Sequence, residues 1–328
     1  MIAVHFGRFA EQWFEEAKLS ESTRTQRRRV YERDVKPFLN ARPIQDIDAD
    51  EVRAVCERVK SRGAPATAVH AREVIKNVFA FARAKGYGAR NPVEEIPAKS
   101  VAVFHPRERS LSPNEIGILC RLLEDAPARL EYRFALKLIL LTLARRSELV
   151  FAKWPEIDFE GGIWTVPPGR AKSTRDRYIY LSRQALDILM ELKARAGASA
   201  YVLPSMLDPF MPMAPVCLNH TTTAIFKEAQ SRKLPLKRFS LYDLRRTGST
   251  ILREAGFNAH WVELAPAREV IEAQRGLDRE QHSEQLRHML QEWADVVDAW
   301  ASGAADTPAF ASLYRGPLEH HLRPHAGG

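Results

Sequence analysis

The 328-residue chain is poor in cysteine, and its cysteines do not occur in pairs. It has only Cys56, Cys120 and Cys217, which are far apart and in no CxxC spacing. This pattern indicates reduced thiols in a cytoplasmic protein and argues against a disulfide framework or a cysteine-based metal site. The sequence also lacks a Walker loop and an HExxH motif. We therefore expect no nucleotide cofactor and no metal ion.

Long apolar runs are missing as well. The most apolar stretch, residues 134–144, contains Lys137 and is too short to span a bilayer. The amino-terminal sequence MIAVHFGRFAEQWFEE lacks the basic flank and apolar run of a signal peptide. The sequence therefore predicts neither a membrane partner nor secretion.

Negative charge is in deficit, with 41 acidic against 49 basic residues and a formal net charge of +8. A positive net charge favours association with a polyanion such as DNA, although it does not determine the fold. On charge alone, a basic soluble protein without such a partner remains the alternative. Hydrophobic residues make up 45% of the chain, and its length suits two domains of about 100–200 residues each.

Residues 1–90 carry helical periodicity and no strand pattern, which predicts a small helical domain. Helices are expected over residues 6–17, from Ser20 or Ser22 to Pro37, from Asp48 to the glycine at 63, and over 66–85. The acidic residue Glu51, three positions after Asp48, is typical of a capping box.

The second of these helices is crowded with arginine. Arg24 and Arg28 lie four residues apart on one face, where like charges repel each other unless an anion is near. We expect Arg24, Arg27 and Arg28 to contact DNA phosphates. Such contacts would contribute to affinity without recognising the base sequence of the DNA. The alternative is a solvated helix whose charges are compensated by neighbouring acids: Glu21, Glu32 and Asp34.

Residues 91–110 contain several prolines and little periodicity, and they are predicted to be a linker. A second domain is expected over 111–303, mainly α-helical with one small antiparallel β-hairpin at 162–181, and a loose tail over 304–328. Its first helix should start after Ser112, with Pro113 in the first turn. Further helices are expected up to 143 and over 182–196, 215–230, 242–255 and 280–301.

Basic residues occur at the ends of three elements of this second domain. Arg145 and Arg146 follow an apolar helix, with Ser147 as a candidate N-cap of a short helix. Lys172 lies at the tip of the hairpin, and Arg245 opens a late helix, where free amides and the dipole favour an anion. Each position alone is typical of a solvated surface. Together, three cations from separate elements indicate a site that surrounds one phosphodiester.

Two long segments resemble the catalytic domain of tyrosine recombinases, specifically phage and genomic-island integrases. They are TLARRSELVFAKWPEIDFEGGIWTVPPGRAKSTRDRYIYLSRQALDIL and FSLYDLRRTGSTILREAGF. The earlier segments SESTRTQRRRVYERDV and GAPATAVHAREVIKNVFAFA resemble the core-site-binding helical domain of the same family. The resemblance implies double-stranded DNA as partner, a role in DNA recombination or integration, and self-association or pairing with an active recombinase. The arm-binding domain common in such integrases is expected to be absent.

The resemblance also implies roles for individual residues. Arg145 falls on the first catalytic arginine of the family, and Glu148 on the acid that usually follows it. Lys172 falls on the hairpin lysine, which acts as general acid toward the leaving 5′ oxygen. Arg245 falls on the second catalytic arginine.

Three other family positions carry different residues here. Tyr242 stands where the family usually has histidine, and Arg268, preceded by Pro266, stands at the His or Trp position. Asp278 occupies the position of the nucleophilic tyrosine. No tyrosine occurs between residues 243 and 313, and Tyr314 lies in the tail.

An aspartate is a poor replacement for that tyrosine. An aspartyl phosphate is prone to hydrolysis, and a carboxylate with an ordinary pKa of about 3.9 is ionised and repelled by the phosphate at neutral pH. We therefore expect a DNA-binding protein of this family whose strand cleavage is lost. The alternatives are an active integrase with an unusual nucleophile and a type IB topoisomerase-like enzyme, which would need the same missing tyrosine.

Overall fold

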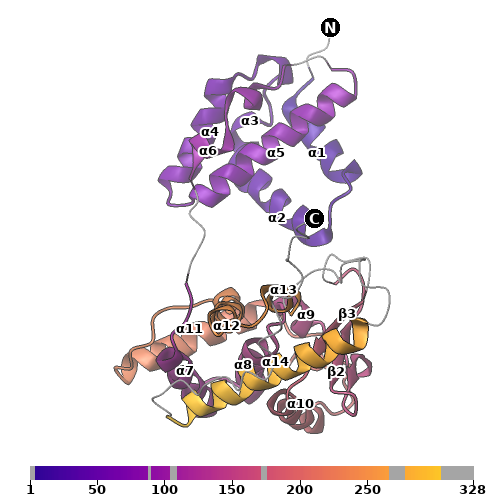
Figure 1. Cartoon of the computed structure of the whole chain (residues 1–328). Helices are drawn as coiled ribbons and strands as arrows, with labels where there is room; N and C mark the ends of the chain where they lie inside the picture. Colours follow the sequence, from indigo (N-terminus) through magenta and orange to yellow (C-terminus); the bar gives the residue numbers. More distant parts are fainter. Residues whose placement is uncertain (1–3, 88–89, 104–108, 171–175, 266–277, 304–328) are drawn as a thin grey trace, which may run out of the picture. The chain divides into compact units, whose positions relative to one another are not determined.

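The structure is a computed structural model that describes residues 4–87, 90–103, 109–170, 176–265 and 278–303 (Figure 1). The chain divides into two compact units, Met1–Arg107 and Glu108–Gly328. Both are built mainly from helices, as expected from the sequence. Within the described ranges, every helix is too short or too polar to cross a bilayer.

The first unit is a helical bundle with α5 (Pro65–Ala84) packed against α1 (Phe6–Glu16), α2 (Glu21–Val30) and α4 (Ala49–Ser61). The helix starts follow the sequence signals. The Ser20 hydroxyl caps α2, and Asp48 and Glu51 form the expected capping box at α4. The second helix does not end at Pro37, because a π-helical turn over Tyr31–Val35 continues into α3 (Lys36–Leu39). Proline is tolerated there because it lies in the first turn of α3.

Residues 91–101 belong to the first unit and are not a free linker. They form a short turn, η3 (Pro92–Glu95), and a short helix, α6 (Ala98–Val101). Val93, Ile96 and Val101 are buried in the core of the bundle. The buried guanidinium of Arg72 donates hydrogen bonds to the carbonyls of Ile96 and Val93. The prolines conceal this packing in the sequence, because they interrupt the periodicity by which a core-facing segment is recognised.

The second unit surrounds the apolar helix α8 (Leu130–Thr142), which contacts α7 (Pro113–Asp125), α10 (Arg183–Arg195), α11 (Val216–Ser231) and α12 (Leu241–Glu254). The long helix α14 (Asp278–Ala301), coloured orange to yellow in Figure 1, packs against both α7 and α8. Two short helices complete the described part of the unit: α9 (Arg146–Val150) and α13 (Ala259–Leu264). The capping box predicted at Ser112 is present at the start of α7.

The predicted hairpin is confirmed and gains a third strand. The antiparallel sheet has the order β1 (Ile157–Asp158), β2 (Ile163–Val166) and β3 (Arg177–Tyr180). Trp164 pairs with Ile179 across β2 and β3, and both side chains are buried against the helices. Alternation along β3 points Arg177 and Ile179 to the same, buried face.

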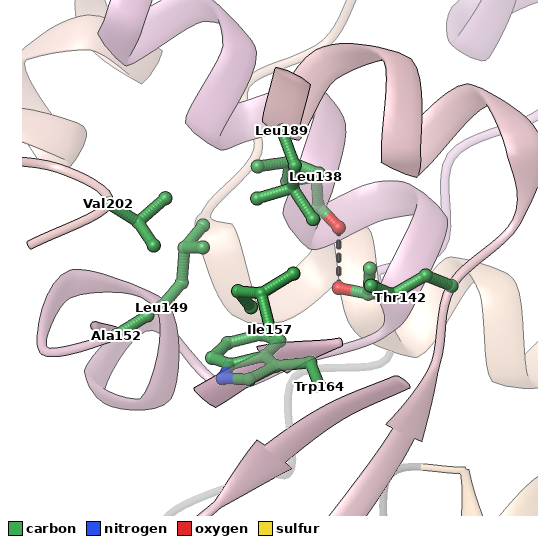
Figure 2. Close-up of a pocket in the computed structure, with 9 residues that line it drawn as sticks. Leu138, Thr142, Leu149, Ala152, Ile157, Trp164, Leu189 and Val202 are labelled. Atoms are coloured by element: carbon green, nitrogen blue, oxygen red, sulfur yellow. Dashed lines mark hydrogen bonds between the residues drawn. The ribbon is translucent and has the colours of Figure 1, made fainter. Parts of the chain in front are cut away.

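Figure 2 shows the apolar centre of the second unit, where Leu138, Leu149, Ile157 and Trp164 surround a small void. The void has a volume of about 10 Å³, which is at most the space needed by one water molecule. The hydroxyl of Thr142 is satisfied inside its own helix, because it donates to the Leu138 carbonyl at 2.6 Å. This void is a packing feature of the core and is too small for a ligand.

Gly117 permits a close approach between α7 and α14. A Cβ atom at this position would overlap the backbone carbonyl oxygen of Trp300. We expect Gly117→Ala to lower the free energy of unfolding by about 1–3 kcal/mol, because backbone must move to relieve the overlap. Thermal unfolding measures the effect, and Glu124→Ala on the exposed face of the same helix is the control. An unchanged melting temperature for Gly117→Ala would show that the two helices are not in close contact.

Candidate functional site

A cavity of about 570 Å³ opens in the second unit where several helices begin. We call it the arginine cavity. It brings together Arg145, Arg245 and Tyr242, which the sequence had placed in one site. The complete lining is Ala144, Arg145, Arg146, Ser147, Asn219, Ser240, Leu241, Tyr242 and Arg245.

A sharp backbone reversal places Arg145 at this cavity. Helix α8 ends at Thr142, and the C-cap residue Leu143 has a φ of 53°, in the left-handed region. The chain then turns into α9. The backbone N–H of Arg145 donates to Oε2 of Glu148, and its Nη1 donates to Oε1, both at 2.7 Å. The expectation that Ser147 caps this helix is wrong. Helix α9 already begins at Arg146, so Ser147 lies inside its first turn.

Glu148 is fully buried and lies between two guanidinium groups. Besides Arg145, it accepts a hydrogen bond from Nη1 of Arg177, and Nη2 of Arg177 donates to the carbonyl of Ala265. Burial alone would raise the pKa of Glu148. The charge of Arg177 and the hydrogen bonds from Arg177 and Arg145 outweigh burial and hold that pKa below its ordinary value. The carboxylate is therefore ionised and accepts donors from both arginines.

Arg245 lies one turn into α12. The helix starts at Ser240, whose hydroxyl accepts from the Asp243 amide while its own N–H donates to Oδ2 of Asp243 at 2.7 Å. Burial and the charges of Arg145 and Arg177 lower the pKa of Arg245 to about 10. The guanidinium is still protonated at neutral pH. Within the described part of the chain, three guanidinium groups lie around the Glu148 carboxylate, and the repulsion among their charges favours an anion in the cavity.

Tyr242 precedes Arg245 on the same helix, and its side chain is 66% exposed. It is the one tyrosine in the lining of the cavity, as far as the described residues extend. A phenol can donate a hydrogen bond to an anion, as the histidine usual at this family position can.

Several predicted residues lie outside the described part of the chain. These are Lys172, Arg268 and Tyr314. Asp278 is the first residue of α14, but its side chain is likewise not described. Helix α13 ends at Leu264, two residues before Pro266 in the sequence.

The arginines of α2 have partners within their own unit. Arg24 donates to the Ala17 carbonyl at 2.9 Å. The guanidinium of Arg27 lies 5.8 Å from the ring centre of Trp13. Arg28 lies over the ring of Phe14 and forms ion pairs with two acids, Glu11 and Glu32. Contacts of these arginines with DNA stay a prediction.

Sequence reasoning did not single out Arg177, which is the buried residue that connects the cavity with β3 and α13. A signal was present in the alternation of the RYIY segment, where the arginine occupies an inward-facing position next to isoleucine. An arginine on a buried strand face requires a buried acid. The partner could not be deduced, because Glu148 is separated from Arg177 by 29 residues and lies on another element.

Family models and curated relatives match most of the chain. The phage integrase central domain matches residues 6–99, and the phage integrase family domain matches residues 109–266. The chain is 32% identical over 307 residues to prophage integrase IntZ of Escherichia coli K12, covering 92% of this chain and 73% of the relative. It is 30% identical over 303 residues to prophage integrase IntA of the same strain, covering 90% and 70%.

Solved structures agree on the fold. A lambda integrase dimer bound to a COC′ core site has a TM-score of 0.64 and 16% identity, covering 83% of this chain and 98% of that one. The Tn1549 transposon integrase in complex with transposon right-end DNA has a TM-score of 0.68 and 16% identity, covering 86% and 99%. Identity at this level shows the fold alone. Together with the family models and the prophage relatives, it leads to one conclusion: this chain belongs to the phage integrase family of tyrosine recombinases.

Proposed function

We propose that this chain is a DNA-binding integrase-family protein that holds a backbone phosphate in the arginine cavity and does not cleave the strand. The observation that carries the proposal is the meeting of Arg145 and Arg245, from helix ends 100 residues apart, in one cavity, where the charge of Arg145 acts on Arg245. Arginine offers a planar set of donors that matches phosphate oxygens. The same two positions carry the catalytic arginines in the family that the chain resembles.

Loss of cleavage is proposed from the residue at the start of α14. Tyrosine attack would store the broken bond as a phosphotyrosyl ester, which a DNA hydroxyl can reverse. Asp278, at the corresponding position, would form a hydrolysable acyl phosphate and is repelled by the phosphate while ionised. A protein with the arginines in place and no suitable nucleophile binds the phosphate without exchanging strands.

A suicide substrate tests this proposal. Nicked duplexes with att-like core sequences are incubated with the protein, denatured, and analysed for a covalent protein–DNA adduct. We expect no adduct from the wild-type chain and an adduct from Asp278→Tyr, because the variant has a phenol at the position where the family carries its nucleophile. Lambda integrase with a COC′ core site serves as the reference protein for the assay. An adduct on any residue of the wild-type chain would contradict the proposed loss of cleavage.

The second candidate is an active integrase with an unusual nucleophile, and Tyr242 is the residue that favours it. Its phenol lines the same cavity as both arginines. If the wild-type chain forms an adduct that disappears in Tyr242→Phe, this second candidate replaces the first. A Tyr242→Phe variant that retains DNA affinity and an adduct-free wild type support the first candidate.

Self-association on DNA is part of the proposal. The structural relatives include a lambda integrase dimer bound to a core site and a lambda integrase tetramer bound to a Holliday junction. A chain of the same fold that lacks cleavage could occupy one position of such an assembly, either with its own copies or with an active recombinase.

A further inference from the structure

We infer that Arg177 is a positioning residue for phosphate binding: it fixes the guanidinium of Arg145 through Glu148 and also fixes the end of α13 through the Ala265 carbonyl. The inference rests on the proposed function, in which the arginine cavity holds a DNA phosphate. Arg177 does not line that cavity. Its hydrogen bonds reach Arg145 through Glu148, and its charge also lowers the pKa of Arg245.

The first step is the division of the Glu148 carboxylate between two arginines. Oε1 accepts from Nη1 of Arg145, while Oε2 accepts from Nη1 of Arg177 and from the Arg145 backbone amide. Because Arg177 satisfies Oε2, the side chain of Arg145 reaches only one carboxylate oxygen. The hydrogen bond from Nη1 of Arg145 to Oε1 constrains the orientation of the Arg145 guanidinium relative to Glu148.

The second step is the hydrogen bond to Ala265. This residue follows α13, and its carbonyl accepts from Nη2 of Arg177 at the carboxyl end of that helix, where a cation is favoured. Ala265 is also the last described residue before 266–277, the stretch in which the family resemblance places Arg268. One guanidinium thus connects strand β3, the cavity arginine and the chain end that leads into this stretch.

The third step is burial. Arg177 is 5% exposed and Glu148 is not exposed, and desolvation lowers the pKa of Arg177 despite the charge of Glu148. Replacing such a pair with apolar residues is often neutral or stabilising, so stability alone does not explain its presence. The requirement for two directed hydrogen bonds to separate elements does explain it, because only arginine has a fork of donors that can reach both.

The test uses Arg177→Lys, which retains the charge but offers one ammonium group in place of the fork. We expect affinity for a short random-sequence duplex to fall roughly tenfold, and the slope of log affinity against log salt to become shallower by about 0.9, as one phosphate contact is lost. Arg145→Ala should produce the same change of slope. The double variant Arg145→Ala/Arg177→Lys should bind DNA only slightly more weakly than Arg145→Ala alone, because both changes remove the same phosphate contact.

The salt slope separates positioning from a general loss of stability. Gly117→Ala is expected to destabilise the unit without changing the slope, since it does not touch the cavity. Arg195→Lys, in an exposed pair with Glu191, controls for the substitution type. If Arg177→Lys folds poorly, Glu148→Gln/Arg177→Met removes both buried charges and should show the same shallower slope.

An unchanged salt slope in both Arg177→Lys and Glu148→Gln/Arg177→Met would overturn the inference. Additive effects of Arg145→Ala and Arg177→Lys on the binding free energy would overturn it as well. The proposed function fails differently: in that case the wild-type chain itself would bind the duplex with no dependence on salt, or not at all.

Discussion

Glu148→Gln should lower the free energy of unfolding of the second unit by about 3–5 kcal/mol at neutral pH, because it removes one partner of a buried ion pair. The buried guanidinium of Arg177 would then lack its compensating charge. Glutamine retains the shape of the side chain, but its amide group presents donors toward the donors of Arg145 and Arg177. Urea unfolding of the variant and the wild type measures the difference.

The difference in the free energy of unfolding between Glu148→Gln and the wild type should become smaller at acidic pH. The folded-state pKa of Glu148 is below its ordinary value, so the unfolded chain takes up the proton at a higher pH than the folded chain does. The contribution of Glu148 to the free energy of unfolding is therefore fully present when the pH is above the ordinary pKa of a carboxyl group. It is lost as the pH falls through the lowered pKa of the folded state. Glu191→Gln, which breaks the exposed pair with Arg195 on α10, should cost only about 0.3–0.5 kcal/mol. Equal effects at both sites would contradict the buried network.

DNA binding by the wild-type chain should weaken by at least about 10³-fold between 50 and 200 mM salt, the behaviour of proteins that contact six or more phosphates. Arg245→Ala should weaken binding further, by roughly 10–100-fold, since a hydrogen bond to a charged group contributes about 1.5–3 kcal/mol. Its salt slope should be shallower by about 0.9, the value for one lost phosphate contact. Fluorescence anisotropy with a labelled duplex at several salt concentrations measures affinity and slope together.

Arg245→Ala should not unfold the protein. Burial and the neighbouring arginines lower the pKa of Arg245 to about 10, so its charge is disfavoured in the folded state and truncation removes that penalty. Arg232→Ala is the matched control, because Arg232 is paired with Asp125 and Glu228 on the surface. An Arg245→Ala variant that binds like the wild type, with the same salt slope, would exclude the arginine cavity from the DNA interface.

The helix boundaries could be predicted because local chemistry sets them. Ser20, Asp48 and Ser112 each accept a hydrogen bond from an amide of the turn that follows, and the helices start where these residues occur. The β2–β3 hairpin was equally visible, since its alternating apolar and polar residues match a half-buried strand. Family membership was recognised from ordered segments and is now shown by the matched relatives.

Where packing depends on residues far apart in the chain, the sequence was a poor guide. Residues 91–101 looked like a linker, yet Val93 and Ile96 complete the core of the first unit. Ser147 has the chemistry of an N-cap, but the backbone reversal at Leu143 starts the helix before it. In each case a contact or a backbone turn outside the local segment overrode the local preference.

By itself, the sequence determined the positions of most helices and the family, and it predicted that Arg145 and Arg245 meet at one site, because these follow from neighbouring residues and from motif order. Only the tertiary structure decided that Arg145 and Arg245 share a cavity and that Arg177 and Glu148 support it from within. The physical reason is that a buried charge is stable only with partners at hydrogen-bond distance. Those partners come from helix and strand ends that are neighbours only after the chain has folded.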